Sequence, residues 1–139
     1  MFKSKRAERI DGQVKLRIRD NSVRLRLTRS EVDAAGAAER VAGRTRFVAT
    51  QDFVYALESC DSSPAPTARF DGETLLVRVP ANVLRAWATS DEVSIRGEEV
   101  LPGGGVLSLL VEKDFACLAP RDGEDESDMF VHPRAGEND

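Results

Sequence analysis

Two runs of alternating polar and apolar residues, joined by a turn, most constrain what this chain can fold into. Residues 15–19 read KLRIR and residues 23–27 read VRLRL, with the turn-forming residues DNS between them. Because successive side chains of a strand point to opposite faces, this pattern predicts a β-hairpin. One face of the hairpin carries only aliphatic side chains and is expected to be buried.

The opposite face of the predicted hairpin carries only cations. Arginine forks match the paired oxygens of phosphate and carboxylate groups, so the sequence predicts an anion-binding surface there. The alternative is a solvated face, or one that is salt-bridged by acids from neighbouring strands or from the C-terminal tail. The five candidate residues are Lys15, Arg17, Arg19, Arg24 and Arg26.

The pattern of the following residues predicts an α+β fold. Thr28 and Glu31 form a capping box for a short helix that ends near Gly36, and Asp71-Gly72 is a strong hairpin signal. A second helix is expected after Pro80. Further strands are predicted within 37–50 and at 52–59, 68–70, 74–79, 93–96 and 106–111. About six to eight short, mainly antiparallel strands with two short helices predict a strongly curved sheet or a partly closed barrel. The sequence shows no internal repeat.

A chain of 139 residues predicts one domain. We expect a polar leader at 1–13, the α+β domain at 14–119 and an acidic, mostly disordered tail at 120–139. The start of the chain has no apolar region typical of a signal peptide, and no stretch is long and apolar enough for a membrane span. These features predict a cytoplasmic protein that does not bind membranes.

Charge is divided unevenly along the chain. Residues 1–29 hold ten Lys and Arg against three acids, whereas residues 112–139 hold three against nine. Opposite charges at the two ends predict that the tail lies partly over the basic hairpin and competes with external anions.

Few residues offer catalytic or metal chemistry. His132 is the single histidine, and Cys60 and Cys117 lie far apart, so neither a zinc site nor a nucleophile–histidine pair is predicted. The glycines at 103–105 lack a phosphate-loop motif. The sequence therefore predicts no cofactor and no metal, and favours a protein that is not an enzyme. Three carboxylates would form a charged site if the fold brings them to the cations: Glu58, Glu112 and Asp114.

Nucleic acid is not favoured as a partner. No aromatic residue stands among the cations at 15–29 to stack on bases, and the calculated isoelectric point is about 5.1.

Three segments resemble a family of small bacterial cytoplasmic proteins of unknown function. They are KLRIRDNSVRLRLTRSEV at 15–32, YALES at 55–59 and LLVEKDFACL at 109–118, and the similarity extends over about 14–133. The resemblance implies a single domain and supplies no catalytic residues.

Two functions follow from these observations. The first is a non-enzymatic binding or accessory domain with an unknown protein partner or small anionic ligand. The alternative is an anion- or phosphate-binding protein, or small enzyme, that uses the cations of the first hairpin.

Overall fold

The computed structural model describes residues 8–9, 13–115 and 128–130. Their elements are β1 (Glu8–Arg9), β2 (Lys15–Arg19), β3 (Ser22–Leu27), α1 (Arg29–Gly36), β4 (Arg40–Val48), β5 (Gln51–Cys60), β6 (Thr67–Phe70), β7 (Thr74–Pro80), α2 (Ala81–Ala88), β8 (Ser94–Val100) and β9 (Val106–Lys113).

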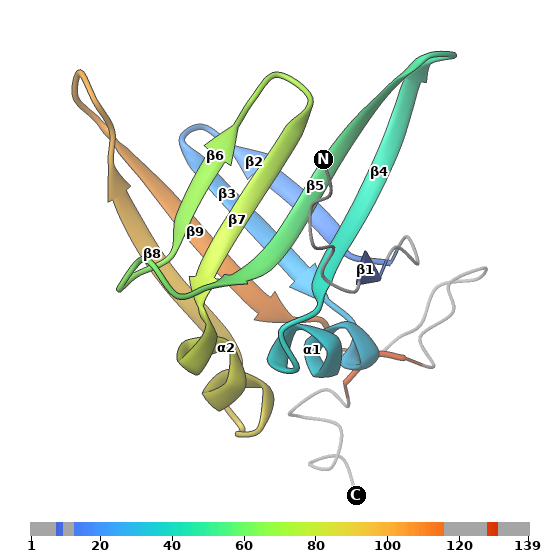
Figure 1. Ribbon diagram of the computed structural model, residues 1–139, viewed down its shortest axis with the longest axis vertical. Helices are drawn as coiled ribbons and strands as arrows, with labels where there is room; N and C mark the ends of the chain where they lie inside the picture. Colours follow the sequence, from blue (N-terminus) through green and yellow to red (C-terminus); the bar gives the residue numbers. More distant parts are fainter. Residues whose placement is uncertain (1–7, 10–12, 116–127, 131–139) are drawn as a thin grey trace, which may run out of the picture.

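These strands form two mixed sheets. Sheet A has the order β1-β4-β5-β7-β6, and sheet B has the order β2-β3-β9-β8. Figure 1 shows the sheets diverging from a common base, where α1 and α2 lie side by side. Buried aliphatic side chains from both sheets and both helices form one core, together with Trp87.

The α+β class, the two short helices and the first hairpin are confirmed, and eight strands are present besides the two-residue β1. The strongly curved sheet or partly closed barrel of the prediction is not confirmed by the arrangement of the strands. The described strands form two sheets, and no closed barrel is present among them. Three of the seven strand pairs in the described part of the chain are parallel, and each of the three joins strands that are not consecutive in the sequence.

The structure contains an internal repeat, although the sequence shows none. Each half is a hairpin, a helix and a second hairpin, and β2, β3 and α1 begin 52 residues before β6, β7 and α2. Each half contributes one hairpin to each sheet, so the halves interlock. The strand registers match as well: Glu58 lies opposite Arg78 in sheet A, as Glu112 lies opposite Arg26 in sheet B.

Local chemistry explains how the helices and turns begin. The Thr28 amide donates a hydrogen bond to Glu31 Oε1 at 2.9 Å, which is part of the predicted capping box. The Glu31 side chain is fully buried. Asp71 accepts hydrogen bonds from the amides of Thr74 and Glu73 in the β6–β7 turn. These bonds favour the charged carboxylate and lower the pKa of Asp71.

The contact between the helices requires one small residue. A Cβ atom on Gly36, the last residue of α1, would lie 2.5 Å from Ala88 Cβ, at the end of α2. Gly36 and Ala88 occupy equivalent positions in the two halves, 52 residues apart. The helices therefore approach closely at the point where the two halves meet.

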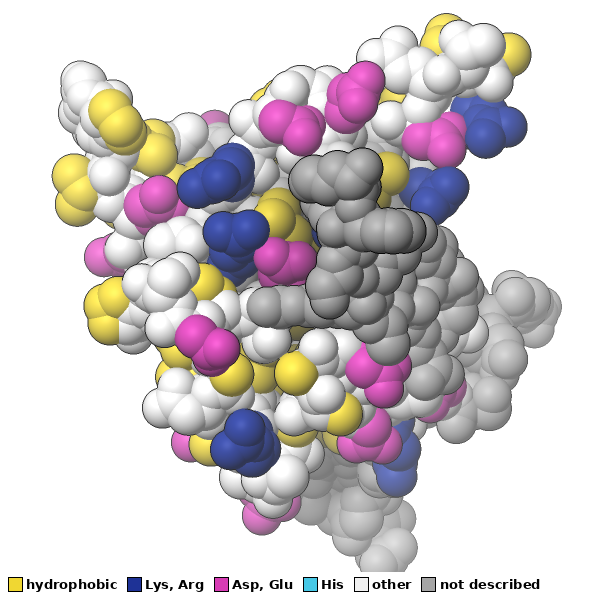
Figure 2. Space-filling model, in the orientation of Figure 1, with side chains coloured by type: hydrophobic (Ala, Val, Ile, Leu, Met, Phe, Trp, Pro, Cys, Tyr) yellow, Lys and Arg dark blue, Asp and Glu magenta, His cyan; other side chains and the backbone are white. Residues whose placement is uncertain are grey.

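The hairpins β4–β5 and β8–β9 extend away from the helices, and their tips expose hydrophobic side chains at the upper right and upper left of Figure 2. Phe47 and Val100 are 75% and 79% exposed. No described helix is long and apolar enough to cross a membrane.

The helix contact predicts the effect of two substitutions. Gly36→Ala should lower the free energy of unfolding by about 1–3 kcal/mol, because the added methyl group overpacks the contact with Ala88. The double variant Gly36→Ala with Ala88→Gly, which exchanges the equivalent residues, should recover much of this loss. Urea unfolding measures both free energies. A Gly36→Ala variant as stable as the parent would contradict the close helix approach.

Candidate functional site

The register of the first hairpin brings its five cations to one face. Lys15 lies opposite Arg26 and Arg17 opposite Arg24, while Val23, Leu25 and Leu27 turn into the core. The cations therefore share the outer face of sheet B. We call Lys15, Arg17, Arg19, Arg24 and Arg26 the basic face.

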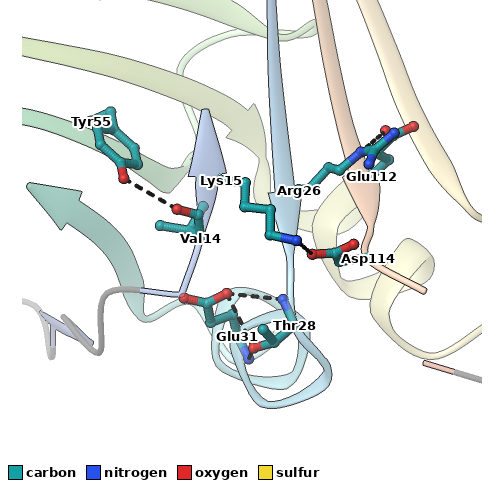
Figure 3. A network of polar contacts seen from close by, with 8 residues as sticks. All are labelled: Val14, Lys15, Arg26, Thr28, Glu31, Tyr55, Glu112 and Asp114. Atoms are coloured by element: carbon teal, nitrogen blue, oxygen red, sulfur yellow. Dashed lines mark hydrogen bonds and ion pairs between the residues drawn. The ribbon is translucent and has the colours of Figure 1, made fainter. Parts of the chain in front are cut away.

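Acidic residues at the end of β9 neutralise part of the basic face, as Figure 3 shows. Glu112 Oε1 lies 2.7 Å from Arg26 Nε and 3.6 Å from Arg24 Nε. Asp114, which is 5% exposed, pairs with Lys15 at 3.1 Å. Two of the three predicted carboxylates thus meet the cations.

Glu58, the third predicted carboxylate, does not join this group. It lies on the outer face of sheet A, where it pairs with Arg78 at 3.0 Å and Arg40 at 3.8 Å. The internal repeat explains this position, since Glu58 is the structural equivalent of Glu112 and Arg78 that of Arg26. The two Arg–Glu pairs are the same interaction, made once in each sheet.

Arg17 and Arg19 are exposed and form no ion pair within the part of the chain that the structure describes. A third such arginine, Arg96, comes from β8 and faces the same side of sheet B. Sequence reasoning missed Arg96, because the strand containing it was predicted to end there. The polar residues Ser94, Arg96 and Glu98 stand at every second position, and this period of two was the sequence signal that a strand continues past Arg96 with these side chains on one face.

An open hollow lies between Arg24 and Arg96. Its volume is about 480 Å³, and Leu110 of β9 stands between the two arginines in the same row of the sheet. The other outward-facing side chains that line it are Ser22, Glu98 and Ser108. The hollow combines two guanidinium groups, two hydroxyl groups, the Glu98 carboxylate and an apolar floor. Its arginine side is suited to an anion with an apolar portion.

The internal repeat provides a comparison for this row. In sheet B the row reads Arg17, Arg24, Leu110, Arg96, and the equivalent row of sheet A reads Arg69, Leu76, Ala56, Ala42. The neighbouring Arg–Glu row is shared by both sheets, whereas two of these three arginines are found in sheet B alone. The shared row therefore fits a structural role. In the row that differs, Ala42 and Ala56 of sheet A are each 1% exposed, whereas Arg17 and Arg96 of sheet B are exposed, so sheet B presents this row as a surface.

Cys60 is buried beside a polar loop. Hydrogen bonding to the hydroxyl and amide of Ser62 lowers the pKa of Cys60.

Cys117 and His132 lie outside the described residues. No group of three or more histidine, cysteine or acidic side chains that could hold a metal ion occurs among the residues described.

Asp128 and Phe130 belong to the predicted tail, and they contact the base of the fold away from the hollow. The Asp128 carboxylate accepts hydrogen bonds from the Ser30 amide and hydroxyl in α1. The Phe130 ring packs on Phe115, with Lys113 Nζ 5.5 Å from its centroid. The expected contact of the tail with the basic face falls on residues outside those described, so it stays a prediction.

A family model matches residues 14–134. The chain belongs to DUF7009, a family of unknown function. The resemblance to a family of unknown function is therefore confirmed. No curated protein matches the chain, and no solved structure does so either.

Because the Arg–Glu pair is repeated in this DUF7009 chain, removing its carboxylate should destabilise the fold equally in the two sheets. Glu58→Gln and Glu112→Gln should each lower the free energy of unfolding by about 1–3 kcal/mol, because each leaves two neighbouring arginines without their carboxylate. Glu73→Gln, on an exposed turn, is the control and should change it by less than about 0.5 kcal/mol. Denaturant unfolding gives the three values. A loss of unfolding free energy in only one of the two glutamine variants would refute the structural equivalence of the two Arg–Glu pairs.

Proposed function

We propose that this DUF7009 protein is a non-enzymatic binding domain, which takes up a ligand with phosphate or carboxylate groups on the outer face of sheet B. The observation that carries the proposal is the hollow between Arg24 and Arg96, with Arg17 and Arg19 beside it and without ion-pair partners in the described chain. We further propose that it acts in the cytoplasm, where the thiol of Cys60 stays free.

The residue types around the hollow support an anionic ligand. Guanidinium groups on both sides of an apolar floor can hold two oxygens each and leave Leu110 against the rest of the ligand. The outward residues of β3, β9 and β8 in this region include no aromatic ring, so the surface offers no base stacking for single-stranded nucleic acid.

The lining residues also favour binding over catalysis. The hollow has two serines and one glutamate but neither histidine nor cysteine among its lining residues. A nucleophile and an adjacent base, which acyl or phosphoryl transfer through a covalent intermediate needs, are not offered there by an imidazole or a thiol.

The proposal predicts a loss of affinity that depends on the position of the substituted arginines. Arg24→Gln with Arg96→Gln should weaken binding of inorganic tripolyphosphate by about tenfold or more, since both flanking donors are lost. Arg44→Gln with Arg69→Gln is the matched control, because it removes the same charge from sheet A. Isothermal titration calorimetry at low salt measures the affinities, and added salt should weaken binding by the parent steeply.

Equal weakening in the two double variants would show that net charge alone attracts the anion. Absence of binding by the parent would reject the site. Parallel titrations with citrate distinguish a carboxylate ligand from a phosphate ligand.

A further inference from the structure

β2 is an edge strand of sheet B and pairs only with β3 among the described strands. The other edge of this sheet, β8, lies against sheet A, where the Ala68 amide of β6 donates to Glu99 at 2.9 Å. The side chains of Arg17, Ile18 and Arg19 are exposed. Within the described part of the chain, no strand pairs along the outer edge of β2 at the end next to the turn.

The turn determines which backbone groups face this edge. Asp20 and Asn21 form a two-residue turn with Asp20 at φ 49°, so Arg19 and Ser22 are its closing pair. The closing pair of such a turn is hydrogen-bonded, and hydrogen-bonded pairs alternate along an antiparallel ladder. The N–H and C=O groups of Leu16 and Ile18 consequently point away from β3, toward the open edge.

The side chains of β2 give this edge two different faces. Arg17 and Arg19 extend on the outer face and carry no ion-pair partner in the described chain. Ile18 faces the opposite side, in line with Val23, and is 58% exposed. Natural edge strands often carry cations that discourage pairing, but an exposed isoleucine in the same strand favours it.

We propose that the β2 edge binds an extended segment of a partner protein in which acidic residues alternate with apolar ones, by addition of a strand to sheet B. The segment would pair its backbone with Leu16 and Ile18, place its acids against Arg17 and Arg19, and place its apolar residues against Ile18. Charge disfavours the chain's own residues 1–7 as the occupant, since they contain three cations and no acid. This inference goes beyond the proposed anion site, because it uses the backbone edge of β2. The two sites share Arg17 and Arg19, but the strand edge does not include the hollow.

The test uses the full chain and a fluorescent peptide of about seven residues in which Glu and Ile alternate. A peptide of the same composition with the Glu and Ile residues in two blocks is the control, because it has the same charge without the period of two. Fluorescence anisotropy should show about tenfold tighter binding of the alternating peptide. Equal affinities of the two peptides would overturn the proposal.

Ile18→Pro removes the outward N–H and leaves the β3 ladder intact, since proline is tolerated where an edge amide faces solvent. It should abolish binding of the alternating peptide and leave tripolyphosphate binding unchanged. Conversely, Arg96→Gln should weaken tripolyphosphate binding and spare the peptide, so failure of the edge and failure of the hollow are distinguishable. Peptide binding by Ile18→Pro at the parent's affinity would contradict strand addition.

Hydrogen exchange on the parent protein tests the proposal without any substitution. Saturating alternating peptide should slow exchange of the Leu16 and Ile18 amides, which the added strand would take as donors. If the peptide binds and both amides still exchange at the rates measured without peptide, the proposal is overturned.

Discussion

The parallel pairing of strands from opposite halves of the chain is the constraint on which the structure depends. β3 pairs with β9 and β5 with β7, so neither sheet can be completed by one half alone. The same pairing brings together Arg26 with Glu112 and Arg78 with Glu58, two partly buried ion pairs at equivalent positions. The close approach of α1 and α2 at Gly36 then holds the two halves together at the base.

This repeated architecture lets one half of the molecule serve as a reference for the other. Positions that the fold needs are expected to be alike in both halves. The Arg–Glu pairs are alike in this way. So are Gly43 and Gly97, which both occupy core-facing strand positions. The arginine row over the hollow differs between the sheets. Arg17 and Arg96 are exposed in sheet B, whereas Ala42 and Ala56 are buried in the equivalent row of sheet A.

Local signals in the sequence were sufficient to predict the elements. The alternation at 15–27, the capping box at Thr28 and the Asp71-Gly72 turn each act within a few residues, and each is confirmed. The division of the strands into two sheets could not be predicted from local signals, because it depends on pairing between strands that are not neighbours in the chain. The repeat was hidden because the two halves share a burial pattern and few residue identities. Arg96 joins the site only through β9, which brings it beside the first hairpin.

An amide NMR titration with tripolyphosphate tests most directly whether the outer face of sheet B binds an anion and that of sheet A does not. The signals of Arg24, Leu110 and Arg96 should move as tripolyphosphate is added. Signals of their equivalents in sheet A, Leu76, Ala56 and Ala42, should stay in place. Equal shifts in both sheets, or none in sheet B, would contradict anion binding on sheet B alone.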